Sequence, residues 1–188
     1  MRVALLSHTA SPHAPTGAER SLALLAAGLA RRGHEVAVAA PGPWSLGEVL
    51  ADAGVDVVTI PTRACWLVQW RPQPALRQAG RWLRFVAPDP GRRRLAAWLD
   101  GCAPDVVHVN CLPHLGGAAA AASRGLPVVW HVREMLPVSR RRAWWAERVR
   151  RYATAVVAVS AAVAGWLEDA GVGDRTTVCL LYTSDAAD

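Results

Sequence analysis

The chain has 188 residues, a length that suits one domain with a sizeable core. Its composition, 52% hydrophobic and 19% charged, excludes a disordered chain. No run approaches the ~18 consecutive apolar residues of a membrane span, and the first apolar run is too short for a secretory signal. A cytoplasmic location is therefore expected. The formal net charge of +6 is carried by 21 arginines without a lysine, which fits a GC-rich coding bias as well as an anionic partner.

The first sixty residues alternate between apolar runs and helical patterns. Strands are predicted at Arg2–Ser7, Glu35–Ala40 and Val55–Ile60. A capping box of Thr16 and Glu19 starts a helix that ends at Gly33. A second capping box, at Ser45–Glu48, starts a helix that ends at Gly54.

The alternation is interrupted by a segment rich in arginine, tryptophan and proline, in which helices are predicted at Pro74–Val86 and Pro90–Asp100. It then resumes, with strands predicted at Asp105–Asn110, Pro127–Val132 and Ala155–Val159. The helices that follow these strands are an alanine-rich one to Gly125, a basic one at Arg140–Tyr152, and one capped by Ser160 and closed by Gly171. Strands that alternate with helices pair in parallel, so the chain is predicted to form a doubly wound, Rossmann-like α/β domain.

In an open parallel sheet, ligands bind outside the carboxyl ends of the strands. Polar residues follow three of the predicted strands. His8 lies in the loop after the first strand, Asn110 ends the fourth, and His131, Arg133 and Glu134 lie at the end of the fifth. By topology these exits lie on one rim, so we expect them to form a single cleft.

Two residues at this rim are candidates for function. Gly17 lies in the first turn of the Thr16-capped helix, where free main-chain N–H groups suit a phosphate, although a simple helix cap explains it equally well. His131 is the candidate catalytic residue, against the more common structural role of a lone histidine. The G-x-G-x-x-G pattern of dinucleotide-binding proteins is absent, which argues against an NAD enzyme.

Five segments together resemble the large retaining glycosyltransferase family usually numbered four, whose GT-B fold has two Rossmann-like domains. They are Thr16–Ser21, Leu29–Val36, Pro104–Val109, Pro127–Glu134 and Val156–Ser160. The resemblance covers Arg2–Ala40 and Asp105–Val178. It implies that residues 1–178 are the N-terminal, acceptor-side domain of such an enzyme.

The resemblance also implies roles for individual residues. Thr16, Gly17 and Ala18 would approach the donor diphosphate or the acceptor, and Thr16 stands where the family more often has a glycine. His131 would lie near the transferred sugar. The acceptor cleft would contain His8, Asn110, Arg133 and Glu134. The resemblance further implies a nucleotide sugar as a substrate and no metal or other cofactor. The nucleotide sugar would be held mainly by a second domain, which carries a pair of glutamates eight residues apart. Nothing here matches that pair, so the fragment alone is expected to be inactive.

The last ten residues, 179–188, depart from the rest in composition, with two aspartates in four residues and neither arginine nor glycine. They resemble the translation of a transposase adaptor used to prepare sequencing libraries. We therefore expect that the gene was cut at about Val178, that residues 179–188 are not part of the natural protein, and that they pack poorly against the core.

The segment Arg63–Trp98 carries eight arginines against Asp89 as its single acidic residue. Arginines interleaved with tryptophans suit the surface of an anionic membrane, on its cytoplasmic face. The alternative is a solvated arginine face whose tryptophans pack inside the protein. Two other functions remain open for the chain: a basic nucleic-acid-binding module and a non-catalytic saccharide-binding domain. The sequence contains no recognisable nucleic-acid-binding motif, so no nucleic acid is expected as a partner.

Overall fold

A computed structural model describes residues 1–65 and 90–179 of the chain. The predicted helix at Pro74–Val86 and residues 180–188 lie outside the described residues. The elements, in chain order, are β1 (Arg2–Leu6), α1 (Gly17–Arg31), β2 (Glu35–Ala40), α2 (Gly47–Asp52), β3 (Asp56–Thr59), α4 (Pro90–Cys102), β4 (Val106–Asn110), α5 (Leu115–Ala122), β5 (Val128–Val132), α6 (Arg140–Tyr152), β6 (Ala155–Ala158), α7 (Ala161–Asp169), η2 (Gly173–Arg175) and β7 (Thr176–Val178).

The described strands form one seven-stranded sheet in the order β3-β2-β1-β4-β5-β6-β7. Every pair of neighbouring strands is parallel, which confirms the predicted doubly wound α/β fold. All six predicted strands are present, with ends that differ from the prediction by no more than one residue. The seventh, β7, was not predicted, because three residues are too few to show a pattern.

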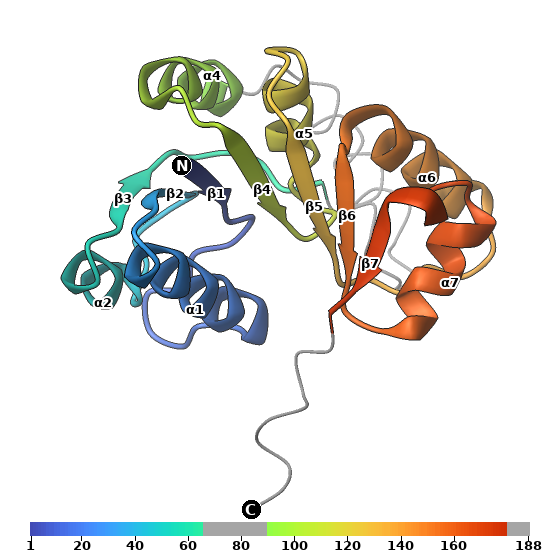
Figure 1. The fold of residues 1–188 in the computed structure, drawn as a ribbon, viewed down its shortest axis with the longest axis horizontal. Helices are drawn as coiled ribbons and strands as arrows, with labels where there is room; N and C mark the ends of the chain where they lie inside the picture. The colour runs from blue at the N-terminus through green and yellow to red at the C-terminus, as the bar shows by residue number, and fades with distance from the viewer. Residues whose placement is uncertain (66–89, 180–188) are drawn as a thin grey trace, which may run out of the picture.

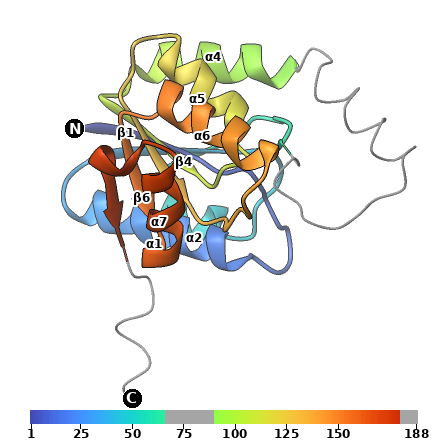
Figure 2. The same ribbon diagram turned by 90° about the vertical axis from the view of Figure 1, so that its right-hand side faces the viewer.

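Helices cover the two faces of the sheet unequally (Figures 1 and 2). On one face, α1 and α2 pack over β1 and β2, through buried side chains that include Leu22 and Leu50. On the other face, α4, α5, α6 and α7 contribute to a larger core, in which Leu99, Trp145 and Trp166 are buried with residues of β4, β5 and β6. Successive strand residues alternate between these faces, as Leu5 and Leu6 do, because side chains of a strand point to opposite sides.

The sheet has its topological switch point between β1 and β4. From β1 the chain proceeds outward through β2 and β3, and β4 then lies on the opposite side of β1, followed by β5, β6 and β7. The connections that leave the carboxyl ends of β1 and β4 therefore diverge, and in open parallel sheets ligands bind at such a point.

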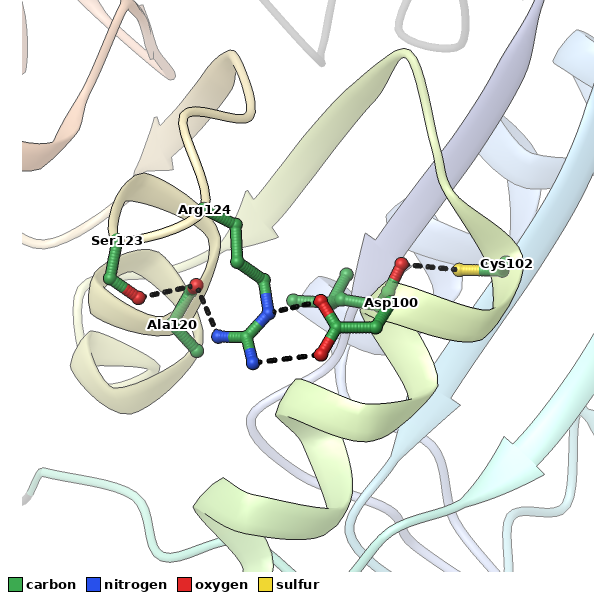
Figure 3. Close-up of polar contacts among 6 residues, drawn as sticks. Asp100, Cys102, Ala120, Ser123 and Arg124 are labelled. Carbon is green, nitrogen blue, oxygen red and sulfur yellow. Dashed lines mark hydrogen bonds and ion pairs between the residues drawn. The ribbon is translucent and has the colours of Figure 1, made fainter.

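The helices α4 and α5 lie side by side, joined at their ends by an ion pair (Figure 3). The guanidinium of Arg124 donates to both carboxylate oxygens of Asp100, with Nε–Oδ1 at 2.6 Å and Nη2–Oδ2 at 3.0 Å. The same guanidinium donates to the carbonyl of Ala120, which also accepts from the Ser123 hydroxyl. The hydrogen bond from Arg124 lowers the pKa of Asp100.

Two of the three predicted helix caps are confirmed. Thr16 and Glu19 form the reciprocal capping box of α1, and the Ser160 hydroxyl accepts from the N–H of Val163 at the start of α7. The predicted box at Ser45 is wrong: α2 begins after Leu46, and the Ser45 hydroxyl instead donates to the carbonyl of Ser11 at 3.0 Å. A distant loop carbonyl has thus taken the place of the local cap.

The described ends of the arginine- and tryptophan-rich segment differ in character. Arg92, Arg93 and Arg94 are exposed on α4. Trp98 is half-buried and packs against the larger core. The described part therefore combines a solvated arginine face with an internally packed tryptophan, whereas Trp66, Trp70, Trp82 and Phe85 lie outside the described residues.

Candidate functional site

Glu19 holds the loop between β1 and α1 in place. Its side chain is fully buried and accepts hydrogen bonds from the N–H groups of Ser11, at 2.7 Å, and Thr16, at 2.6 Å, and from the Ser11 hydroxyl, at 3.0 Å. Burial acts to raise the pKa of Glu19, but the hydrogen bonds from Thr16 and Ser11 outweigh it and lower the pKa. The carboxylate is therefore charged at neutral pH and anchors the loop against α1.

Gly17 is the first residue of α1, beside this anchored loop. Apart from its chain neighbours and its own helix backbone, a Cβ atom added to Gly17 would meet no atom within 4 Å in residues 1–65 and 90–179, so the space next to it is open. The Thr16 hydroxyl takes the N–H of Glu19, and the N–H groups of Gly17 and Ala18 have no partner within the helix. The helix end thus presents N–H groups, with their partial positive charge, to an open space at the rim of the sheet.

A hydrogen-bonded network joins the start of α1 to the ends of β4 and β5. The Asn110 amide donates through Nδ2 to the carbonyl of Ala18, at 3.1 Å, and accepts through Oδ1 from Nε of Arg133, also at 3.1 Å. Arg133 donates through Nη2 to the hydroxyl of Ser21, at 2.8 Å, and lies 3.3 Å from Nδ1 of His131. The predicted exits of β4 and β5 are therefore brought together with the Gly17 helix, as their topology indicated.

His131 lies inside this network but is buried, with 5% of its surface exposed. A catalytic role predicts that His131 is at least partly exposed, and that prediction is wrong, because Arg133 and His108 pack against it. The two imidazole rings meet edge to face, with centroids 5.6 Å apart. Burial, the positive charge of Arg133 and the proximity of His108 lower the pKa of His131 to about 3. Its Nε2 atom is buried and has no hydrogen-bond partner among the described residues.

His8 is half-buried at the exit of β1, beside the same network. Its Nδ1 atom and the hydroxyl of the neighbouring Thr9 are buried and have no partner in the described part of the chain. Burial lowers the pKa of His8, opposed by a hydrogen bond with the Asn110 main chain and by the charge of Glu19. Buried polar atoms without partners are uncommon in folded proteins and mark places where a ligand or water completes the bonding.

Glu134 uses its carboxylate within the protein. Its Oε2 atom accepts from the N–H of Leu112, at 3.2 Å, and from the N–H of Arg133, at 3.0 Å. Burial raises the pKa of this carboxyl despite these hydrogen bonds. The contacts hold together the turns that follow β4 and β5, including Cys111 with its unusual φ of 76°.

Three residues of the site did not stand out in the sequence: Ser11, Ser21 and His108. Ser11 and Ser21 contribute only hydroxyl or main-chain contacts to residues elsewhere in the chain, so no local pattern marks them. His108 carries a signal that was available. It lies two residues before Asn110 on β4, and Asn110 is the register partner of His131, so both histidines point to the same face of the sheet.

Together these residues offer hydrogen-bond donors and positive charge at one edge of the sheet. Such a site can hold and stabilise an anionic or oxygen-rich group. Within residues 1–65 and 90–179, no group of three or more His, Cys, Asp or Glu side chains is placed to bind a metal ion. No helix in the same ranges is long and apolar enough to cross a membrane.

The parallel sheet and its rim define a Rossmann-like domain of the kind found in GT-B glycosyltransferases. The sequence model of Glycosyltransferase Family 4 matches residues 15–179, and the chain belongs to that family. Comparison with curated protein sequences finds no match.

Solved structures confirm the fold. HepE (Alr3699) of Anabaena, crystallised with UDP-glucose, aligns with a TM-score of 0.65 and 21% identity over 95% of this chain and 43% of that one. MurG of Acinetobacter baumannii aligns with a TM-score of 0.54 and 16% identity over 86% of this chain and 42% of its own. The lipopolysaccharide outer core galactosyltransferase WaaB aligns with a TM-score of 0.59 and 12% identity over 95% and 45%. This chain thus spans less than half the length of each.

Proposed function

We propose that this chain is the acceptor-side domain of a longer retaining glycosyltransferase. The enzyme transfers a sugar from a nucleotide-sugar donor to a lipid-linked, saccharide or other cell-envelope acceptor. A second Rossmann-like domain, outside this chain, holds most of the nucleotide. The family match supports the reaction class, and the solved complex of HepE with UDP-glucose supports a nucleotide sugar as donor.

The observation that carries the proposal is the network that ties α1 to β4 and β5. Asn110 and Arg133 fix the open end of the Gly17 helix relative to His131, whose Nε2 atom has no partner in the part of the chain that the structure describes. Because Nε2 is buried in this domain, a side chain at the rim has to move aside before substrate reaches it. Donors that are already oriented stabilise developing charge without reorganising during the reaction.

Each residue of the site has its own role in the proposed reaction. The free N–H groups of Gly17 and Ala18 bind phosphate or acceptor oxygens, with Thr16 holding the helix end. His131 donates to the sugar that is transferred. His8 lines the acceptor side of the cleft together with Asn110, Arg133 and Glu134, the last three mainly by shaping it. We propose that no metal takes part, so the initial rate of the parent enzyme should be unchanged by EDTA.

We propose a cytoplasmic location at the inner face of the membrane, with the arginines of Arg63–Trp98 near the lipid. The exposed Arg92, Arg93 and Arg94 support this, since basic side chains near an anionic bilayer each contribute about 1 kcal/mol to binding. Sedimentation of the chain with vesicles tests it. Binding to vesicles that contain phosphatidylserine, and not to phosphatidylcholine alone, is expected; equal binding to both would contradict it.

The decisive test of the function is to recover the genomic sequence beyond Val178 and assay the encoded protein. A second Rossmann-like domain with two glutamates eight residues apart, and transfer of sugar with retained anomeric configuration, are expected. A complete reading frame without that domain would favour a non-catalytic saccharide-binding protein. A strong, salt-dependent affinity for DNA would favour the nucleic-acid module instead.

A further inference from the structure

The Arg133 side chain makes three contacts at the rim of the sheet. Its Nε–H donates to Asn110 and its Nη2 donates to Ser21. The second hydrogen on Nη2 is directed to Nδ1 of His131, 3.3 Å away. These three contacts come from β4, α1 and β5, so the guanidinium is fixed from three sides and cannot rotate freely.

The contact with His131 determines where the imidazole carries its proton. A guanidinium has only donors and no acceptor, so Nδ1 of His131 has to accept. In a neutral imidazole one nitrogen accepts and the other donates. The proton therefore lies on Nε2, the buried atom that has no partner among the described residues.

We propose that Arg133 is a positioning residue that holds His131 as a neutral Nε2–H donor for an oxygen of the substrate. His131 then stabilises negative charge on that oxygen and does not act as a base. The proposal rests on the proposed function for the identity of the oxygen, but the position of the proton is independent of it.

The electrostatics of the pocket agree with this assignment. The groups that face His131 are the cationic Arg133 and the neutral His108, both of which disfavour a second proton on the ring. The pKa of His108 is itself lowered to about 4, by burial and by Arg133. Both histidines are therefore neutral across the physiological range, and a base at this position would need Nε2 to be unprotonated, which Arg133 prevents.

Long-range ¹H–¹⁵N NMR of the ¹⁵N-histidine-labelled chain tests the tautomer directly, because a protonated and an unprotonated ring nitrogen differ widely in chemical shift. We expect His131 to be the Nε2–H tautomer, unchanged from pH 5 to pH 8. In Arg133→Met, which removes the donor but keeps an unbranched side chain, His131 should show both tautomers and should titrate at a higher pH. Arg32→Met, at an exposed arginine that caps the C-terminus of the helix that carries Ser21, is the matched control and should change nothing.

The Nδ1–H tautomer in the unmodified chain would overturn the proposal, and so would an unchanged His131 in a folded Arg133→Met variant. If Arg133→Met does not fold, Ser21→Ala is the alternative. It removes the hydrogen bond from Nη2 of Arg133 to the Ser21 hydroxyl and should shift the same signals of His131 to a smaller extent. In the parent enzyme, Arg133→Met should lower kcat by about 10- to 100-fold, with less effect on KM and with a new pH dependence near the ordinary range of histidine. A correct tautomer in an inactive parent would refute the proposed function and leave this inference standing.

Discussion

The carboxylate of Glu134 accepts a hydrogen bond from the main-chain N–H of Leu112, 22 residues earlier in the chain, at 3.2 Å. The same oxygen accepts from the N–H of Arg133. One side chain thus satisfies main-chain donors in two turns at the rim, the one after β4 and the one after β5. We therefore predict that the two hydrogen bonds that Glu134 accepts contribute more to the stability of the chain than its negative charge does.

Glu134→Gln should preserve the fold, because the amide oxygen of glutamine can accept both N–H groups. Glu134→Ala should destabilise the chain by roughly 1–3 kcal/mol for each N–H that is left buried without a partner. Urea unfolding of the two variants and the unmodified chain measures this difference. If Glu134→Gln and Glu134→Ala lower the free energy of unfolding by the same amount, the role of Glu134 as an acceptor is refuted.

The effect of Glu134→Gln on the free energy of unfolding should also depend on pH. Because burial raises the pKa of Glu134 in the folded state, its stabilising contribution is complete below the pKa of the unfolded chain and is lost as the pH rises through the folded pKa. The free energy of unfolding of Glu134→Gln, relative to the unmodified chain, should therefore increase with pH from about 4 upward. A difference that stays constant or decreases over that range would contradict the raised pKa.

Gly17→Ala should separate a binding role from a structural one. Beyond its chain neighbours and its own helix backbone, a Cβ at Gly17 meets no atom of the described residues within 4 Å, so the melting temperature should not fall. In the parent enzyme, the added methyl group should lower kcat/KM by about 10-fold or more, because it occupies the space beside the free N–H groups. Gly28→Ala, in the same helix and close only to the end of the Arg31 side chain, is the control and should leave the rate unchanged. Equal rates for the two variants would mean that Gly17 serves only as part of a helix start.

The fold was predictable from the sequence because parallel strands buried on both faces appear as short apolar runs. The runs at Glu35–Ala40 and Ala155–Val159 illustrate this. The reciprocal cap of Thr16 and Glu19 was predictable for a similar reason, since its two residues are three apart. Such local spacing predicts a cap correctly where no distant group competes for its side chains, as at Thr16.

The bonding of the site was not predictable, because its partners are far apart in the chain. Arg133 and Ser21 are separated by 112 residues, and Asn110 and Ala18 by 92. The burial of His131 depends on where the Arg133 side chain goes, which no local pattern records. The predicted cap at Ser45 is absent for the same reason, since the Ser45 hydroxyl donates its hydrogen bond to a loop carbonyl 34 residues away. The order of strands and helices in the sequence predicts the rim, whereas tertiary contacts determine which of its side chains remain available.

Removal of residues 180–188 should leave the melting temperature of the chain unchanged. The prediction follows from their composition, which departs from that of the rest of the chain. A tail that contributed 1 kcal/mol would lower the melting temperature by about 2–4 °C on removal. Truncation after Arg175 is the control: it removes β7, which pairs with β6, and the bond from the N–H of Cys179 to the carbonyl of Ala158. That shorter chain should be clearly less stable, and a similar loss in the chain that ends at Cys179 would show that the tail packs against the core.

His131→Ala in the full-length parent should lower kcat by roughly 30- to 1,000-fold, since a donor that stabilises developing charge is worth ~2–4 kcal/mol of barrier. Its burial adds a second effect: the truncation leaves a small cavity beside His108, so the melting temperature should also fall. The two effects separate when kcat is measured well below the melting temperature of the variant. His108→Ala is the matched control, because it empties a similar buried volume on the neighbouring strand without removing the Nε2–H of His131. If both variants lose the same stability and only His131→Ala loses kcat, His131 acts on the substrate. If both lose stability and neither loses kcat, His131 is a core residue and the catalytic assignment is wrong.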